Sequence, residues 1–269
     1  MTKNVIVIPI YQLEFKNFEI TSLLQGFKIL NKHTIVFITY PNYPTILIEK
    51  MIGTIPYRIE NFNNKYFKSV DGYNELLTSL DFYQRFSQFE YMLIYQTDAY
   101  VFKDELDYWC SLNYDYIGAP WFKGFKNASN NDLFIGVGNG GFSLRKIDTF
   151  INFLRTYRVT IYQALLINFN KKITFLKKIH ALLSYIKNRN NNISITKKLD
   201  CNEDEFFCVH SEFLTKKFRI PEPLFALKFS FEVLPERLYD LNDCKLPFGC
   251  HAWNLYYDTF WKKHIPIIY

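Results

Sequence analysis

The stretch YMLIYQTD at residues 91–98 decides the fold class of this chain. Its first five residues form an unbroken apolar run, which is typical of a strand that is buried on both faces of a sheet. Asp98 follows closely, and ligands of open α/β sheets bind beyond the carboxyl ends of the strands. We therefore expect a strand here, with a candidate site residue at its carboxyl end.

Strand-like and helix-like patterns alternate around this stretch. Apolar runs at residues 5–10 and 34–40 predict two more strands, and apolar residues recur at helical spacing over 18–30 and 73–86. A shorter helix is expected over 103–112, with Asp104 and Glu105 in its first turn. The expected fold class is therefore α/β, with β-α-β units and a mainly parallel sheet.

The composition excludes several classes of protein. The 269 residues are 49% hydrophobic and 22% charged, which excludes intrinsic disorder. No apolar run approaches the roughly 18 residues that span a bilayer. Residues 5–8 lack the flanks of a signal peptide, so we expect a cytoplasmic protein. Five cysteines without a C-x-x-C pair predict reduced thiols.

The positive charge is concentrated in one segment. The formal net charge is +6, yet no Asp or Glu lies between Asp148 and Asp200. Because apolar residues recur there at helical spacing, residues 148–200 are expected to form a basic helical insertion. Its charge indicates either a solvated helical face or contact of residues 149–199 with an anionic membrane surface. The basic residues are Arg155, Arg158, Lys171, Lys172, Lys177, Lys178, Lys187, Arg189, Lys197 and Lys198.

Two features of the first half could carry chemistry. Asp98 could hold a divalent cation through its carboxylate, or it could cap the turn that follows the strand. The run GVGNGG at residues 136–141 has four glycines, which allow a close approach of the backbone to a ligand. The same run is also compatible with a glycine-rich hairpin.

Two features of the second half carry similar alternatives. Glu203 and Asp204 begin an acidic run that could supply a general base, or simply a favourable start to a helix. His251 lies between a glycine turn and Trp253, where an imidazole could complete a metal shell. A histidine beside a tryptophan is more often a packed, hydrogen-bonded core residue.

In this order the motifs resemble a family of GT-A-type glycosyltransferases that is catalogued mainly as a domain of unknown function. The strings that carry the resemblance are QTD at 96–98, YIGAPW at 116–121, GNGGFSLR at 138–145, ED at 203–204 and FGCHAW at 248–253. The resemblance covers nearly the whole chain. It implies one GT-A-like domain over 1–269, with a Rossmann-type mixed sheet flanked by helices. Residues 1–147 would bind a nucleotide-sugar, 148–200 would be the basic insertion, and 201–269 would supply the acceptor and catalytic half.

The resemblance also implies roles for residues that would bind the donor. Asp98 takes the metal-binding last position of a D-x-D motif, and Gln96 replaces the first acid of that motif. His251 matches the C-terminal histidine that contacts the metal or the diphosphate. Gly140 and Gly141 would lie near the donor sugar. The expected cofactor is a divalent cation, Mn²⁺ or Mg²⁺.

The implied reaction moves a hexose from a nucleotide-diphosphate sugar to a hydroxyl of a glycan or lipid-linked glycan, as in surface polysaccharide or lipopolysaccharide. A UDP-sugar is the expected donor. Asp204, next to Glu203, matches the acid that deprotonates the acceptor in inverting members of the fold. Tyr11 follows the first strand, where a contact with the nucleotide is expected.

Two other functions remain open from the sequence. The missing first acid at Gln96 leaves room for a non-catalytic carbohydrate-binding or scaffold protein on the same fold. Nucleic-acid binding by the basic segment is disfavoured, because its aromatic residues have the spacing of helix packing rather than of a stacking platform.

Overall fold

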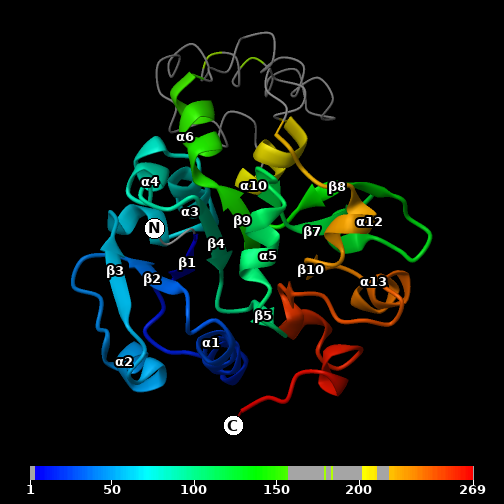
Figure 1. Cartoon of the computed structure of the whole chain (residues 1–269), viewed down its shortest axis with the longest axis horizontal. Coiled ribbons are helices and arrows are strands. Elements are labelled where there is room, and N and C mark those ends of the chain that lie inside the picture. Colours follow the sequence, from blue (N-terminus) through cyan, green and yellow to red (C-terminus); the bar gives the residue numbers. More distant parts are fainter. Residues whose placement is uncertain (1–3, 157–178, 180–182, 184–201, 211–217, 269) are drawn as a thin grey trace. The chain divides into compact units, whose positions relative to one another are not determined.

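A computed structural model describes residues 4–156, 179, 183, 202–210 and 218–268 (Figure 1). The chain forms two compact units, and each is described by itself. Unit 1 comprises residues 1–63, 89–146 and 219–269, and unit 2 comprises residues 64–88 and 147–218. Among the described residues, no helix combines the length and the apolar character that a membrane span requires.

A six-stranded mixed sheet forms the centre of unit 1, with the strand order β3-β2-β1-β4-β9-β6. The first four strands in this order run parallel, and β9 is antiparallel to both β4 and β6. This arrangement confirms the predicted α/β class and the strand over residues 91–95. The strands are β1 (Asn4–Pro9), β2 (Thr34–Thr39), β3 (Tyr57–Asn61), β4 (Tyr91–Tyr95), β6 (Tyr116–Ile117) and β9 (Phe142–Lys146).

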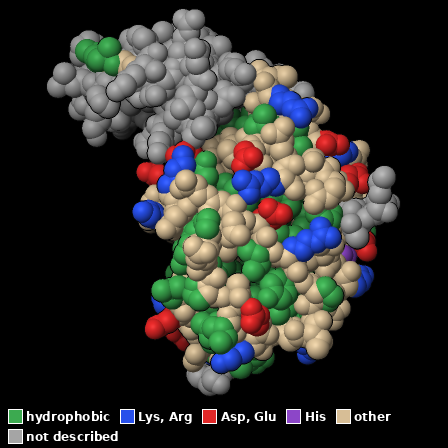
Figure 2. All heavy atoms as spheres, turned by 90° about the vertical axis from the view of Figure 1, so that its left-hand side faces the viewer, with side chains coloured by type: hydrophobic (Ala, Val, Ile, Leu, Met, Phe, Trp, Pro, Cys, Tyr) green, Lys and Arg blue, Asp and Glu red, His purple; other side chains and the backbone are tan. Residues whose placement is uncertain are grey.

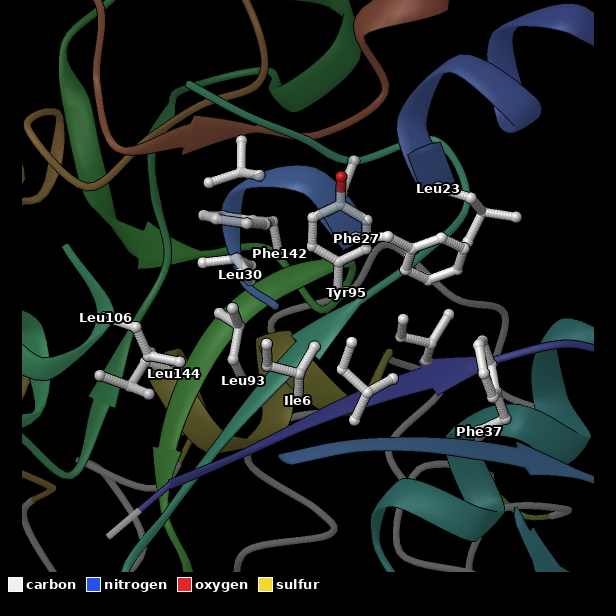
Figure 3. Packing of buried hydrophobic residues seen from close by; sticks show 14 of the residues in the cluster. Ile6, Leu23, Phe27, Leu30, Phe37, Leu93, Tyr95, Leu106, Phe142 and Leu144 are labelled. Carbon is white, nitrogen blue, oxygen red and sulfur yellow. The ribbon is translucent and has the colours of Figure 1, made fainter. Parts of the chain in front are cut away.

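Three helices of unit 1 contribute to the core on one face of this sheet: α1 (Asn17–Ile29), α2 (Ile46–Ile52) and α5 (Leu106–Ser111). Ile6, Leu93 and Leu144 project from neighbouring strands into a cluster that includes Phe27 of α1 and Leu106 of α5 (Figure 3). The residues that alternate with them, such as Val7 and Ile94, are fully buried as well. Burial on both faces explains why these strands read as continuous apolar runs.

Two smaller sheets complete unit 1. One has the order β10-β11-β5, and the other is the hairpin of β7 and β8. A second core cluster around Trp253 and Trp261 packs against them. The elements are β5 (Tyr100–Val101), β7 (Ala119–Phe122), η2 (Phe125–Asn127), β8 (Phe134–Gly138), α12 (Pro223–Ala226), β10 (Ser230–Phe231), α13 (Pro235–Leu241), β11 (Gly249–Cys250), η5 (Trp253–Tyr256) and η6 (Trp261–Lys263).

Unit 2 is helical in its described part and has an aromatic core. The rings of Tyr83 and Phe150 stack with centroids 4.7 Å apart, and Phe207 and Phe218 pack on the other side chains of the cluster. Most of the expected basic insertion lies outside the described residues. The elements are η1 (Asn64–Phe67), α3 (Val70–Leu77), α4 (Leu80–Gln84), α6 (Ile147–Thr156), α10 (Glu203–Glu205) and η4 (Phe206–His210).

The single helix expected over residues 73–86 is wrong, because the chain breaks there into α3 and α4. The Thr78 hydroxyl donates to the backbone oxygen of Asn74 at 2.7 Å, which ends α3. The Ser79 hydroxyl then accepts from the backbone N–H of Phe82 at 3.3 Å and caps α4. Hydroxyl side chains that bond to nearby backbone groups favour such caps over a continuous helix.

The start expected for the helix over 103–112 is also wrong. Asp104 and Glu105 precede α5, which begins at Leu106. The Asp104 carboxylate lies 3.0 Å from both the Lys32 ammonium and His33 Nε2. Pairing with these two bases therefore holds Asp104 outside the helix.

Candidate functional site

The candidate site lies at the carboxyl ends of β1 and β4. These neighbouring strands are parallel, with Val7 opposite Ile94, so residues 10–12 and 96–98 emerge at the same edge of the sheet. This is the edge at which open α/β sheets bind ligands. The strand expected over residues 91–95 is confirmed, and Asp98 follows it at this edge of the sheet.

Three two-residue strands bring His251 to Asp98. Phe231 of β10 pairs with Cys250 of β11 in a parallel arrangement, so Glu232 and His251 leave the small sheet side by side. Cys250 also pairs with Tyr100 of β5, two residues after Asp98. Each of these strands therefore delivers one ionisable side chain to the same place.

The His251 imidazole lies between two carboxylates. Its Nε2 is 3.2 Å from Asp98 Oδ1, and its Nδ1 is 3.1 Å from Glu232 Oε1. Burial opposes the charged imidazolium and is the largest single influence, but the charge of Asp98 and hydrogen bonds to both carboxylates outweigh it. Together they raise the pKa of His251 from 6.5 to about 10. At neutral pH His251 is therefore a cation that donates from both ring nitrogens.

Asp98 shows the complementary effect. Burial favours the neutral carboxylic acid, but the charge and hydrogen bond of His251 act against it and lower the pKa of Asp98 below 3.8. Lys126 contributes to the same lowering. The site therefore holds an ionised carboxylate beside a positive charge that the chain itself supplies.

Gln96 and Gly141 join this cluster. Gln96 Oε1 lies 3.2 Å from His251 Nε2, and the Gln96 backbone N–H donates to the oxygen of Gly141 at 2.8 Å. A β-carbon on Gly141 would lie 2.0–2.6 Å from three atoms of the His251 ring. Gly141 thus makes room for a side chain of the same chain, which is a use of the glycine run that the sequence analysis did not consider.

Gly138, three residues earlier, also leaves room for an aromatic ring. A β-carbon there would lie 2.1–2.4 Å from the indole of Trp121. The indole N–H of Trp121 donates to Glu232 Oε2 at 3.4 Å, a long contact. Asn139, at φ 86°, accepts the backbone N–H of Gly141 on its side-chain oxygen at 3.0 Å. The GNGG segment is therefore a turn fixed by its own hydrogen bonds and packed by the aromatic rings of Trp121 and His251.

A second polar network connects the loops after β1 and β4. The Thr97 hydroxyl donates to Glu19 Oε1 at 2.9 Å, and Gln12 Nε2 donates to the same oxygen at 2.7 Å. The other oxygen of Glu19 accepts the backbone N–H of Lys16 at 2.9 Å, which caps α1. Glu19 thereby ties the turn that carries Asp98 to the first turn of a helix.

Tyr11 lies beside this network at the end of β1. Its side chain is 48% exposed. Partial burial and the negative charges of Asp98 and Glu19 raise the pKa of its phenol. The charge of Asp98 therefore acts on the Tyr11 phenol, and the side chain is still open to solvent. A ligand at this edge of the sheet could contact it.

Glu203 and Asp204 belong to unit 2, where they open α10. Glu203 is buried, with 2% of its surface exposed, and its backbone N–H donates to Asn74 Oδ1 at 3.2 Å. Asp204 is partly exposed and accepts the backbone N–H of Glu205 on Oδ1 at 2.8 Å. Between the two predicted catalytic acids, Asp204 is the one that is open to solvent.

The sequence analysis missed Glu232, Glu19 and Thr97. Glu232 follows a strand of only two residues, which no periodicity can reveal, although an acid directly after the apolar pattern of residues 229–231 was a usable signal. Glu19 carries the mark of a helix start, an acid at the third helical position. Thr97 stands inside the predicted QTD string and was given no role of its own.

Asp98, Gln96 and His251 carry the types of side-chain atom that bind divalent cations. Asp98 Oδ1 and Gln96 Oε1 each lie 3.2 Å from His251 Nε2. Glu232 accepts from the other ring nitrogen, as carboxylates do for metal-bound histidines. Within the described part of the chain, no group of three or more His, Cys, Asp or Glu side chains is arranged for a metal ion. A cation would therefore depend on Asp98, His251 and the amide oxygen of Gln96.

A cavity of about 740 Å³ opens at the opposite, amino-terminal edge of the same sheet. Asn4 and Asp107, which line it, are bound to each other at 2.8 Å. His33, also in its wall, is paired with Asp104. We place the site at the carboxyl edge because the ionised groups there converge on one point.

Solved glycosyltransferase structures are among those similar to this chain. The apo form of GlyE from Streptococcus pneumoniae TIGR4 is 10% identical with a TM-score of 0.47, and a second GlyE structure is 10% identical with a TM-score of 0.46; in both cases 94% of this chain and 55% of that chain are covered. This chain therefore spans little more than half of the GlyE chains. Core-mannan synthase A (CmsA/Ktr4) from Aspergillus fumigatus, in its Mn/GDP form, is 10% identical with a TM-score of 0.37, over 58% of this chain and 63% of that chain.

No curated protein matches the sequence. One family does, over residues 56–251, which is more than half of the chain. The match includes the QTD turn, the GNGG turn and His251. The chain belongs to the family described as protein of unknown function, DUF5672.

Proposed function

We propose that this protein is a glycosyltransferase that moves a hexose from a nucleotide-diphosphate sugar to a hydroxyl of a glycan or lipid-linked glycan. The observation that carries the proposal is the cluster of Asp98, Gln96, His251 and Glu232 at the carboxyl edge of a parallel sheet. A departing nucleoside diphosphate develops negative charge, and preorganised positive groups at such an edge stabilise it.

The donor diphosphate would lie against His251, and the nucleoside would lie toward Tyr11. Two features support this orientation. His251 is a largely covered cation, with 15% of its side chain exposed, whose orientation Glu232 fixes. Tyr11 is a half-exposed aromatic ring at the end of β1. A UDP-sugar is the donor we propose first. Gly140 and Gly141 would border the sugar, with the Gly141 position set by its contact with His251.

Asp98 and His251, assisted by Gln96, would hold a Mn²⁺ or Mg²⁺ ion. When bound, the cation would supply Lewis-acid stabilisation of the leaving diphosphate. To bind the cation, His251 would release the proton on Nε2, while Glu232 keeps the proton on Nδ1 in place. The network of Glu19, Thr97 and Gln12 would hold the Asp98 turn in place while the cation binds.

Asp204 is our proposal for the base. Its carboxylate would take the proton of the acceptor hydroxyl while the acceptor oxygen forms a bond to the anomeric carbon and the bond from that carbon to the diphosphate breaks. This is an inverting displacement, in which a general base contributes a factor of about 10²–10⁴. The solvent exposure of Asp204 supports the assignment over the buried Glu203.

The proposal is tested by calorimetry with UDP-, GDP-, CMP- and dTDP-sugars, each with and without Mn²⁺. One nucleotide is expected to bind with a dependence on Mn²⁺, and Asp98→Asn is expected to remove that dependence. Asp148→Asn is the matched control, because it makes the same change to an acid of α6 that has no place in the proposed site. Well-folded protein that binds no donor would favour a non-catalytic carbohydrate-binding protein on the same fold.

A further inference from the structure

The hairpin of β7 and β8 has one apolar face that packs and another that does not. Phe122 and Phe134 face inward and stack with centroids 4.6 Å apart against the core of unit 1. Leu133 immediately precedes β8, and Ile135 lies where the register between β7 and β8 shifts; both side chains are open to solvent. Leu133 is 76% exposed and Ile135 is 45% exposed. Figure 1 shows the connection between β7 and β8 as a long loop that extends away from the central sheet.

This outer face adjoins the candidate site. Trp121 of β7 is bound to Glu232, the partner of His251, and Phe125 packs edge-on against Trp121 with centroids 5.1 Å apart. Phe125 itself is 42% exposed. Lys126, one residue further, is close enough to lower the pKa of Asp98. The exposed apolar residues of the hairpin therefore lie next to the polar residues of the candidate site.

The charge of the hairpin is positive. Lys123 and Lys126 are exposed, and the backbone N–H of Lys123 donates to the oxygen of Leu133 at 2.9 Å, which places a lysine beside the apolar pair. The acid of the loop, Asp132, accepts from both the backbone and the hydroxyl of Ser129 at 2.7 and 2.8 Å. The outer face thus combines aliphatic side chains with two lysines. The loop has one acid, Asp132, so its formal charge remains positive.

We propose that the outer face of the β7–β8 hairpin docks on an anionic lipid bilayer. Phe125, Leu133 and Ile135 would enter the boundary between headgroups and acyl chains, and Lys123 and Lys126 would contact lipid phosphates. Charge complementarity favours this occupant over a second copy of the chain, because two copies of one positive face repel each other.

One consequence rests on the proposed function. A bilayer under the hairpin would lie next to Asp98 and His251, so the acceptor would be a glycan on a lipid carrier rather than a free one. The docking itself needs no donor and no catalysis, so it can be tested without them.

The test is cosedimentation of the whole chain with vesicles of phosphatidylcholine, alone or mixed with phosphatidylglycerol. We expect binding to the mixed vesicles only, and a partition constant about tenfold or more lower for Leu133→Ser/Ile135→Ser. Ile46→Ser/Leu47→Ser is the matched control, because α2 exposes the same two residue types at 58% and 38%. The face that carries α2 and β3 mixes apolar atoms with both signs of charge (Figure 2). This control is expected to bind like the wild type.

A second pair of variants tests the charge. Lys123→Gln/Lys126→Gln is expected to lower the partition constant by about tenfold or more, since each lysine near such a surface contributes about fivefold. Lys262→Gln/Lys263→Gln removes two exposed lysines of η6 and is expected to change binding less than twofold. Circular dichroism checks that all four variants are folded.

Three results would overturn the docking. The hairpin variants could bind mixed vesicles as the wild type does, the wild type could ignore phosphatidylglycerol, or Leu133→Ser/Ile135→Ser could abolish a dimer seen by sedimentation velocity. Donor calorimetry on the same preparations separates the two proposals. A wild type that binds donor but not vesicles overturns the docking alone, and one that binds vesicles but no donor overturns the proposed function alone.

Discussion

The imidazole of His251 lies directly over the α-carbon of Gly141. A β-carbon at residue 141 would be 2.0 Å from Nε2, well inside any real contact distance. The ring cannot move aside freely, because Glu232 and Asp98 hold its two nitrogens. The second glycine of the GG pair is therefore required by a side chain that lies 110 residues later in the sequence.

Gly141→Ala is expected to destabilise the protein by about 1–3 kcal/mol through overpacking and to weaken donor binding. The measurement is the free energy of unfolding in urea. In a His251→Ala background the same substitution should cost much less, because the ring that it meets is gone. An equal cost in both backgrounds would show that the two residues do not interact.

The unfolding free energy should fall at alkaline pH because of His251. Its pKa in the folded protein is about 10, above the ordinary 6.5, so its stabilisation is full below about 6.5 and is lost as the pH rises through about 10. Between these values the wild type should lose on the order of 3 kcal/mol more than His251→Gln. Parallel stability curves for the two proteins would contradict the assignment.

The same ion pair should weaken in acid for a different reason. The pKa of Asp98 is lowered by His251, so the stabilisation is present above about 3.8 and is lost as the pH falls through the lowered value. Asp98→Asn should therefore reduce the loss of unfolding free energy both at acid pH and at alkaline pH. A carbon-13 NMR titration of the carboxyl groups would follow Asp98 directly, and an ordinary midpoint would count against the pairing.

Thr97 is expected to position the Asp98 turn through its hydroxyl. Thr97→Val keeps the shape but removes the donor to Glu19, so it should cost about 1 kcal/mol of stability and weaken Mn²⁺-dependent donor binding. Thr97→Ser keeps the hydroxyl and is the control. If Thr97→Val binds donor as tightly as Thr97→Ser does, the hydrogen bond has no positioning role.

Asp204→Asn should separate turnover from binding. If Asp204 is the base, the rate of hexose transfer falls by about 10²–10⁴ while the dissociation constant of the donor stays within about twofold. Glu205→Gln, the neighbouring acid of α10, is the matched control and should leave both quantities unchanged. Loss of donor affinity in Asp204→Asn equal to that in Asp98→Asn would argue against separate roles.

The central sheet could be predicted because its strands are buried on both faces. The runs at 5–10, 34–40 and 91–95 contain no charged residue and no polar residue other than threonine, so their length and continuity sufficed. The edge strand Tyr57–Asn61 was missed, although its alternation of apolar and polar residues over Tyr57–Glu60 was a usable signal of a half-buried strand. One helix was predicted over 73–86 where the structure has two, because the apolar spacing continues through Ser79. Only the hydrogen bond by which the Ser79 hydroxyl caps α4 reveals the break.

The site could be predicted only in part. Gln96, Asp98, Gly141 and His251 were each named from the sequence, and the structure brings these four together. Glu232 was not named, because its place depends on the pairing of Phe231 with Cys250, two residues far apart in the chain. Local patterns carry no information about such pairings. The Gly141 contact was hidden for the same reason.

The site residues Asp98, Glu232 and His251 stand beside strands of only two residues, whereas the central sheet has strands of up to six. Few backbone hydrogen bonds hold such short strands, so they can open while the large sheet stays closed. Amide hydrogens around Cys250 should then exchange with deuterium well before those of Leu93. The central sheet would then exchange slowly, and the two-residue strands beside the candidate site would exchange quickly. A ligand that stabilises these short strands would be detected first as slower exchange at Cys250.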